Sequence, residues 1–125
     1  MGQRRILIVD DEDDIREIAQ LSMELGGWGT CTASCGRDAV GVAAEQHPDA
    51  VLLDVMMPGL DGPQTLRQLR ADPATSAIPV IFLTAKVQLS ERRQLRELGA
   101  HGLIAKPFDP MVLAQQVTEI LDGAA

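Results

Sequence analysis

Five short apolar runs recur along the chain, and longer segments with helical periodicity separate them. Most of the runs are almost continuously apolar instead of alternating between apolar and polar residues, and the second run is the weaker one. This pattern is typical of parallel strands that are covered on both faces. We therefore expect strands at residues 6–9, 28–33, 50–53, 79–83 and 101–105.

The intervening segments carry apolar residues three and four positions apart, which is the spacing of one helix face. They predict helices at residues 13–25, around 39–43, through 66–69, at 87–98 and at 110–121. The expected inner face of the first helix consists of Ile15, Ile18, Ser22 and Leu25. That of the second consists of Ala39, Val40 and Ala43.

Two segments carry turn or capping signals. Asp61-Gly62 is expected to form a turn. Asp109 is a common capping residue type, and Pro110 suits the first position of a helix. We therefore expect the last helix to begin there, with a core face of Val112, Leu113, Val117, Ile120 and Leu121.

The alternation of strands and helices predicts an α/β fold. We expect a doubly wound five-stranded parallel sheet of order 2-1-3-4-5, with five helices on both faces. The 125 residues suit a single domain over residues 1–125, with a core at about residues 4–122.

Composition then narrows the class of protein. The formal net charge of −7 argues against direct binding of nucleic acid through a broad basic surface. Cys31 and Cys35 occur without a signal-peptide pattern, so we expect a cytoplasmic protein without a disulfide. No apolar run approaches membrane-spanning length, so we expect no membrane partner.

Polar side chains follow four of the five expected strands. Asp10 and Asp11 follow the first strand, Asp54 the third, Thr84 the fourth and Lys106 the fifth. In the order 2-1-3-4-5 these four strands are neighbours, and their carboxyl ends meet where such sheets bind ligands. The sequence therefore predicts one crevice with three carboxylates, a hydroxyl and an ammonium group.

Three carboxylates at close range require either a proton or a cation. Their hard oxygen atoms suit Mg²⁺. A carboxylate beside such an ion can act as a nucleophile, as in enzymes that form an aspartyl phosphate. Lys106 and Thr84 would then hold the phosphoryl oxygens.

Four sequence motifs carry a resemblance to a known family. They are Ile-Leu-Ile-Val-Asp-Asp at 6–11, Leu-Leu-Asp-Val-Met-Met-Pro-Gly-Leu-Asp-Gly at 52–62, Pro-Val-Ile-Phe-Leu-Thr-Ala at 79–85 and Lys-Pro-Phe at 106–108. In this order and spacing, residues 4–122 resemble the CheY-like receiver domain of bacterial two-component response regulators, which has a flavodoxin-like fold.

The resemblance implies a role for each polar residue. Asp54 would accept the phosphoryl group, Thr84 would move toward it and Lys106 would pair with it. The ligands of Mg²⁺, or of Mn²⁺, would be Asp10 mainly through water, Asp11 and Asp54 directly, and the Met56 backbone carbonyl. The Lys106–Pro107 bond would be cis.

The resemblance also implies a function. A sensor histidine kinase or a histidine phosphotransfer protein would phosphorylate Asp54, and a face at about residues 86–122 would switch its binding of a downstream protein. Arg92, Arg93 and Arg96 lie in this face. The chain would catalyse only its own phosphorylation and dephosphorylation.

Three positions bear on how this switch works. Leu103 stands where the family often has Tyr or Phe, so a switch there must use an aliphatic side chain. Lys86, two residues after Thr84, would be a second cation near the site, and we expect Met56 and Lys86 to tune the lifetime of the phosphate. The last helix, at 110–121, contains no Lys or Arg for charged pairing, and we expect a monomer or a weak dimer.

Three other functions remain as alternatives. A Mg²⁺ phosphohydrolase with an aspartyl intermediate usually has a second acid two residues after the nucleophile, where this chain has Met56. A degenerate, phosphate-independent scaffold would not need the acids, Thr84 and Lys106, which are all present. A flavin-binding relative would want a loop rich in Ser, Thr and Gly, whereas residues 10–14 are Asp-Asp-Glu-Asp-Asp.

Overall fold

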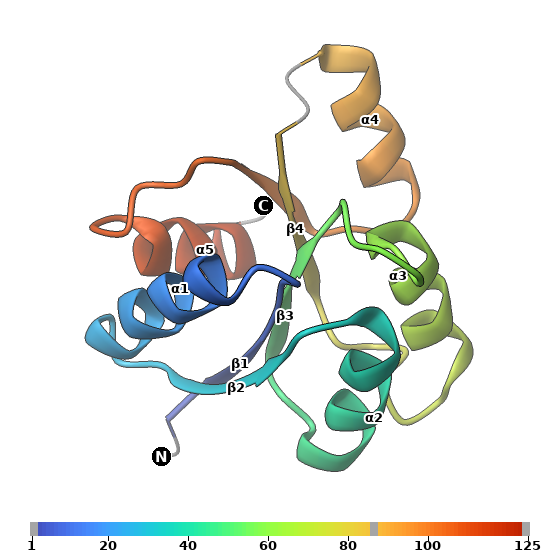
Figure 1. The fold of residues 1–125 in the computed structure, drawn as a ribbon, viewed down its shortest axis with the longest axis horizontal. Coiled ribbons are helices and arrows are strands. Elements are labelled where there is room, and N and C mark those ends of the chain that lie inside the picture. The colour runs from blue at the N-terminus through green and yellow to red at the C-terminus, as the bar shows by residue number, and fades with distance from the viewer. Residues whose placement is uncertain (1–2, 86–87, 124–125) are drawn as a thin grey trace.

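A five-stranded parallel sheet forms the centre of the molecule (Figure 1). The computed structural model describes residues 3–85 and 88–123. Its strands are β1 (Arg5–Val9), β2 (Gly29–Ala33), β3 (Ala50–Asp54), β4 (Val80–Thr84) and β5 (Gly102–Ala105). They lie in the order β2-β1-β3-β4-β5, which confirms the predicted topology. Asp54 is in register with Leu83, and Thr84 with Ala105, so the carboxyl ends of these strands are level.

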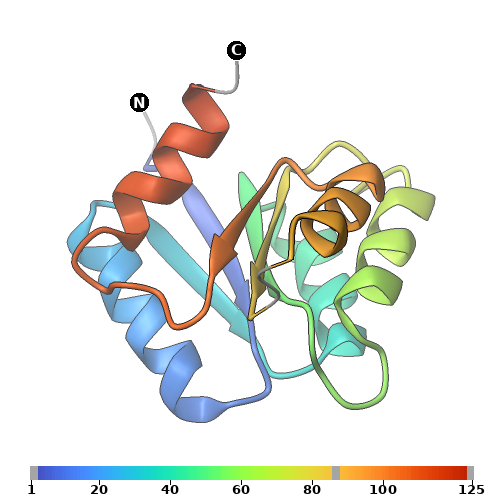
Figure 2. The same cartoon turned by 90° about the horizontal axis from the view of Figure 1, so that it is seen from above.

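Helices cover both faces of this sheet, as predicted. They are α1 (Asp13–Leu25), α2 (Gly36–Gln46), α3 (Gly62–Ala71), α4 (Leu89–Glu97) and α5 (Leu113–Asp122). In Figure 2, α1 and α5 lie on one side of the sheet, and α2, α3 and α4 on the other. None of the helices in the described part of the chain is long and apolar enough to cross a membrane.

The two layers enclose separate apolar clusters because side chains of a strand point alternately to opposite faces. In β1, Ile6 and Ile8 join the cluster under α1 and α5. Leu7 and Val9 join the cluster under α2, α3 and α4. All four side chains are fully buried, which explains why β1 appears in the sequence as a continuous apolar run.

The predicted inner face of α1 is wrong in part. The helix buries Ala19, Ser22 and Met23, whereas Ile18 is 41% exposed and Leu25 is 88% exposed. The reason is the close approach of α1 to α5, since a Cβ atom at Gly26 would lie 2.3 Å from the Ala114 Cβ. Such a contact favours small or flexible side chains at the interface over the larger ones that dominate the periodicity.

The predicted start of the last helix is also wrong. α5 begins at Leu113, with Val112 as its N-cap. Asp109 Oδ1 instead accepts a hydrogen bond from the Met111 N–H at 2.9 Å, which closes a turn before the helix. The Pro110 carbonyl accepts a hydrogen bond from the Ser22 hydroxyl of α1, and this tertiary contact holds the turn outside the helix.

The expected turn at Asp61-Gly62 is instead the start of α3. Asp61 is the N-cap of that helix, and Gly62 is its first residue. Asp61 Oδ1 accepts from the Gln64 N–H, and Gln64 Oε1 accepts from the Asp61 N–H, both at 2.9 Å. This reciprocal pair is a capping box, which satisfies two N–H groups at the helix start.

Candidate functional site

Three aspartates meet at the carboxyl end of the sheet, as the topology predicts. Asp10 follows β1 and is fully buried, Asp11 beside it is exposed, and Asp54 ends β3 with 3% of its surface exposed. One carboxylate oxygen from each lies within 4.8 Å of the other two. Asp10 and Asp11 directly follow the end of β1, and Asp54 is the last residue of β3, so the ends of two neighbouring strands bring the acids together.

Local hydrogen bonds orient the two buried carboxylates. Asp10 Oδ1 accepts from the Glu12 N–H at 2.9 Å, and Asp54 Oδ1 accepts from the Met56 N–H at 3.2 Å. In both cases the side chain bonds the backbone two residues further on, as Asp does where a chain turns away from a strand. These bonds fix the side chains in place at the strand ends.

Lys106 supplies the cation of the site. Its Nζ lies 2.8 Å from Asp10 Oδ2 and 3.2 Å from Asp54 Oδ1. The Lys106 N–H donates to the Thr84 carbonyl at 2.9 Å, so the residue extends the pairing of β5 with β4. The Lys106–Pro107 peptide bond is cis.

The charges of this cluster shift the affinities of its members for protons. Burial, followed by the neighbouring Asp10 charge, raises the pKa of Asp54 to about 6, although Lys106 and the Met56 N–H partly oppose the shift. Burial alone would lower the pKa of Lys106. The hydrogen bonds to Asp10 and Asp54 and the negative charges of these two residues outweigh the effect of burial, so the pKa of Lys106 is raised.

The site is chemically suited to a divalent cation. Asp10 Oδ2 is buried, and apart from Lys106 Nζ no hydrogen-bond donor in residues 3–85 and 88–123 reaches it. A cation would be a second partner for this oxygen. Carboxylate oxygens of Asp10, Asp11 and Asp54 form the set of hard oxygen ligands that Mg²⁺ prefers. The acidic cluster therefore fits such an ion.

Thr84 and Met56 lie beside these groups. Thr84 ends β4 and is almost completely buried, next to the end of β3. The Met56 side chain is 69% exposed, so its thioether lies outside the buried part of the site. Lys86, the expected second cation, lies outside the described residues.

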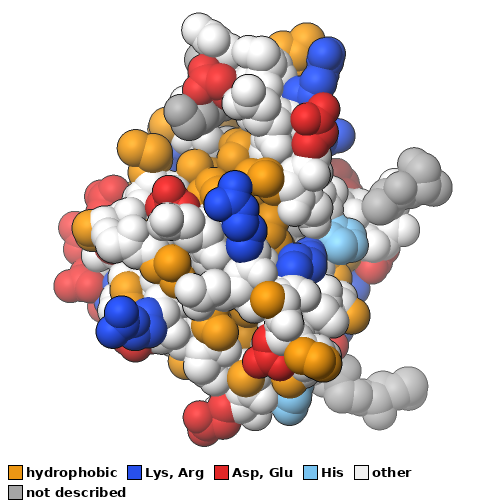
Figure 3. All heavy atoms as spheres, turned by 90° about the vertical axis from the view of Figure 1, so that its right-hand side faces the viewer, with side chains coloured by type: hydrophobic (Ala, Val, Ile, Leu, Met, Phe, Trp, Pro, Cys, Tyr) orange, Lys and Arg blue, Asp and Glu red, His pale blue; other side chains and the backbone are white. Residues whose placement is uncertain are grey.

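The predicted output residues do not join the acids. Leu103 is partly exposed on β5, and Arg92, Arg93 and Arg96 lie on α4. Together with Leu89 they line a hollow of about 340 Å³ on the α4 side of the molecule. Figure 3, in which α4 forms the top, shows exposed apolar side chains directly below that helix.

Two features of the site were not predicted from the sequence. The first is Arg16, which donates to the Asp10 backbone carbonyl at 2.8 Å and pairs with Asp13. Asp13 and Arg16 are three residues apart on one helix face, so the sequence could have predicted their ion pair. It contains no pattern that indicates the contact of Arg16 with Asp10.

The second is an apolar groove of about 420 Å³ beside Lys106. Its lining includes Ile15 and Ile18 of α1 and the Pro107-Phe108 segment. It brings together segments far apart in the sequence, so no local pattern could have revealed it.

The chain is similar to known proteins over almost its whole length. A family model described as response regulator receiver domain matches residues 6–118. Protein PilH of Pseudomonas aeruginosa is 40% identical over 119 residues, which cover 95% of this chain and 98% of that protein. The phosphate regulon transcriptional regulatory protein PhoB of the same organism is 39% identical over 121 residues, which cover 97% of this chain and 53% of PhoB.

Most of these curated relatives are longer. This chain spans about half the length of PhoB and of the probable transcriptional regulators ycf27, such as that of Porphyridium aerugineum, which is 37% identical over 97% of this chain and 49% of its own length.

Solved structures agree with the observed fold. A putative response regulator from Chloroflexus aurantiacus has a TM-score of 0.87 at 34% identity, covering 96% of this chain and 98% of that one. The chemotaxis protein CheY4 of Vibrio cholerae has a TM-score of 0.88 at 26% identity, covering 95% of this chain and 99% of that one. These matches confirm the resemblance noted in the sequence: the chain belongs to the family of response regulator receiver domains of two-component systems.

Proposed function

We propose that Asp54 accepts a phosphoryl group from a sensor histidine kinase or a histidine phosphotransfer protein. The observation that carries this proposal is the buried Asp54 carboxylate, which lies within reach of Asp10, Asp11 and the Lys106 ammonium. In the transfer, an Asp54 oxygen forms a bond to phosphorus while the bond from phosphorus to the donor nitrogen breaks, and its electron pair stays on the donor imidazole. No group other than the carboxylate is consumed on this chain.

The surrounding residues have separate roles in this proposal. Asp10, Asp11, Asp54 and the Met56 carbonyl hold Mg²⁺ or Mn²⁺, and the ion, when bound, neutralises charge on the acids and the phosphoryl oxygens. Lys106, now 3.2 Å from Asp54 Oδ1, pairs with the phosphoryl group once it is attached. Thr84 supplies a hydroxyl from the neighbouring strand end.

We further propose that phosphorylation shifts the population of two conformations of the face at about residues 86–122, and that a downstream protein binds one of them. Leu103 connects this face to the site, because it lies on β5, the strand that ends just before Lys106. The chain would act on no other substrate, catalysing only its own phosphorylation and dephosphorylation.

The same proposal includes the organisation and setting of the protein. Residues 1–125 would form one receiver domain in the cytoplasm, as a monomer or a weak dimer, without direct contact with nucleic acid or membrane. The single sheet and the match to the family over residues 6–118 support this organisation. Sedimentation that finds a tight unphosphorylated dimer would contradict it.

The central claim is tested by incubating the chain with Mg²⁺ and acetyl phosphate and then measuring its mass. We expect the wild type and an Asp38→Asn variant to gain one phosphoryl group, because Asp38 is an exposed acid on α2 that does not belong to the cluster of Asp10, Asp11 and Asp54. We expect Asp54→Asn to gain none. Equal gain by Asp54→Asn, or no gain by the wild type, would overturn the assignment, and turnover of small phosphoesters would favour a phosphohydrolase instead.

A further inference from the structure

The turn between β1 and α1 carries two of the three acids of the candidate site. Asp10 is oriented by its own side chain, which accepts from the Glu12 N–H at 2.9 Å and lies 2.8 Å from Lys106 Nζ. The Asp11 carboxylate is exposed and takes part in no hydrogen bond or salt bridge within residues 3–85 and 88–123. The direction of Asp11 toward the other two acids therefore depends on the backbone of the turn.

Arg16 holds this turn from within α1. The N-cap, Glu12, makes no side-chain cap hydrogen bond, although capping residues commonly do. Arg16 Nη1 donates to the Asp10 carbonyl at 2.8 Å, and its Nη2 bonds to Asp13 Oδ1. The side chain of Arg16 is only 20% exposed, whereas that of Asp13 is 82% exposed. An ion pair with so exposed an acid contributes little, so the bond to the Asp10 carbonyl is the more significant of the two.

The Asp10 carbonyl belongs to the peptide group that joins Asp10 to Asp11. Because a peptide group is planar, a bond that holds its oxygen also fixes the orientation of the plane, and with it the position of the Asp11 Cα. The Asp11 side chain leaves the backbone from that atom. Arg16 therefore acts on the direction of the Asp11 carboxylate through the backbone.

We propose that Arg16 is a positioning residue of the cation site. Through the Asp10 carbonyl it holds the Asp11 carboxylate where all three acids bind the same ion. With this bond in place, carboxylate oxygens of Asp10, Asp11 and Asp54 lie within 4.8 Å of one another. The inference rests on the proposed function only in taking these three aspartates as ligands of Mg²⁺ or Mn²⁺.

The charge of Arg16 makes the sign of its effect informative. A guanidinium near a cation site repels the ion, so charge alone predicts tighter cation binding when a neutral residue replaces Arg16. Positioning of Asp11 predicts the opposite, weaker cation binding. The sign of the change in affinity therefore separates the two effects.

Electron paramagnetic resonance of Mn²⁺ measures the binding directly, because the signal of the free ion decreases when the intact chain binds it. We expect Arg16→Met to weaken Mn²⁺ binding about tenfold, as is typical when a residue that orients metal ligands is lost. Arg16→Lys keeps a donor for the Asp10 carbonyl and should restore part of the affinity. Circular dichroism verifies that each variant is folded, and Arg16→Gln replaces Arg16→Met if that variant is not.

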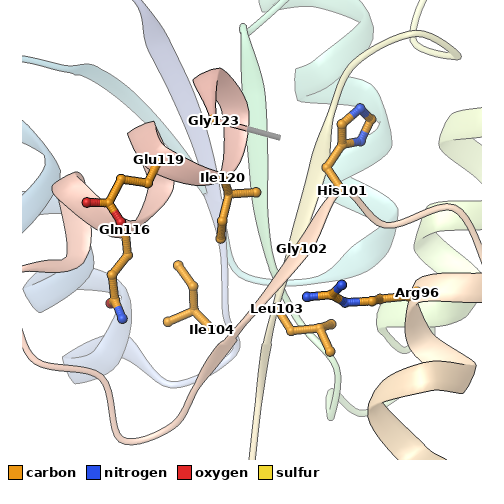
Figure 4. Close-up of a pocket in the computed structure, with 9 residues that line it drawn as sticks. All are labelled: Arg96, His101, Gly102, Leu103, Ile104, Gln116, Glu119, Ile120 and Gly123. Atoms are coloured by element: carbon orange, nitrogen blue, oxygen red, sulfur yellow. The ribbon is translucent and has the colours of Figure 1, made fainter. Parts of the chain in front are cut away.

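Three control variants separate positioning from charge. Arg37→Met removes an exposed positive charge from the hollow of about 510 Å³ that Arg16 also lines. Arg96→Met removes one from α4, where the guanidinium extends toward β5 (Figure 4). Asp13→Asn breaks the ion pair with Arg16 but leaves the Asp10 carbonyl as its acceptor. We expect each control to change Mn²⁺ binding much less than Arg16→Met does, because water and salt screen exposed charges.

Each outcome decides the proposal. Weaker Mn²⁺ binding in Arg16→Met, with a smaller change in all three controls, supports it. Unchanged or tighter binding in Arg16→Met, equal weakening in Arg37→Met, or no binding by the wild type would overturn it. The mass of the same samples is measured after treatment with acetyl phosphate and Mg²⁺. A wild type that binds Mn²⁺ more tightly than Arg16→Met, yet gains no phosphoryl group, would contradict the proposed function and support this inference.

Discussion

At the scale of single residues, the position that we propose for the phosphoryl acceptor, Asp54, carries a cost in stability. Its carboxylate is buried beside Asp10, and these surroundings raise the pKa of Asp54 to about 6. A nucleophile for phosphoryl transfer must be ionised, yet in the absence of a cation the fold disfavours the ionised form. Lys106 relieves this repulsion only in part, since it interacts with both acids at once.

Because the fold disfavours the ionised form of Asp54, we expect Asp54→Asn to stabilise the metal-free protein. The folded-state pKa of Asp54, about 6, lies above the ordinary value of 3.8, so stability is lost as pH rises from below the ordinary value through about 6. At neutral pH and above, the variant should gain about 1 to 2 kcal/mol in free energy of unfolding, less than the full shift implies because Lys106 loses a partner.

Urea unfolding in a chelator at several pH values measures this gain. We expect the difference between Asp54→Asn and wild type to shrink toward zero as the pH falls below the ordinary carboxyl pKa. Glu45→Gln, which alters an exposed carboxylate on α2, serves as the control and should show no such trend. A pH-independent difference would mean that the ionisation of Asp54 is not its cause.

At the scale of elements, the start of α3 is tied to the strand that carries Asp54. The Gly62 N–H donates to the Val55 carbonyl at 3.0 Å, and a Cβ atom at Gly62 would lie 2.6 Å from the Asp54 carbonyl oxygen. The capping box of Asp61 and Gln64 therefore holds a helix whose first turn packs directly against the end of β3.

We expect Asp61→Ala to lower the free energy of unfolding by about 1 kcal/mol, because it removes the acceptor for the Gln64 N–H. Asp61→Ser keeps an acceptor at that position and should lose much less. Urea denaturation of the two variants and the wild type makes the comparison. Equal losses in Ala and Ser variants would show that the cap does not contribute through this hydrogen bond.

The elements also show what the sequence could and could not predict. The strand order and the position of the site could be predicted from the sequence, because continuous apolar runs identify buried parallel strands. Asp10, Asp54 and Lys106 each directly follow such a run. The start of α5 could not be predicted from the sequence, because the Pro110 carbonyl accepts a hydrogen bond from the Ser22 hydroxyl of α1, near the other end of the chain. Local patterns contain no information about such tertiary contacts.

At the scale of the whole molecule, two arginines join distant parts of the chain in different surroundings. Arg4 pairs with Asp122 at 2.9 Å and lies 4.7 Å from the Trp28 ring centre, and so connects the start of β1 with the end of α5. Both partners are largely exposed, and an exposed ion pair contributes little because water screens it.

Arg70 lies in a more enclosed place. From α3 it donates to the carbonyls of Ser76 and Ile78, at 3.2 and 2.8 Å, and to that of Gly99 at 3.2 Å. It thereby joins the connection into β4 to the turn that follows α4. Burial lowers the pKa of the Arg70 guanidinium, so its charge is partly desolvated and relies on these three carbonyls.

The different surroundings of Arg70 and Arg4 therefore predict unequal losses in the free energy of unfolding when each arginine is replaced by Met. Arg70→Met should lower the free energy of unfolding by about 2 kcal/mol, because three carbonyls lose a charged donor together. Arg4→Met, the matched control, should cost less than about 1 kcal/mol, and raising the salt concentration should shrink that loss further. Urea denaturation at low and high salt measures both variants.

Hydrogen exchange should also become faster at the turn around Gly99 in Arg70→Met alone, because the Gly99 carbonyl after α4 then loses its hydrogen bond from α3. An equal decrease in the free energy of unfolding of both variants, with unchanged protection of the turn from hydrogen exchange, would contradict this role. It would mean that the three carbonyl contacts of Arg70 do not hold the end of α4 in place.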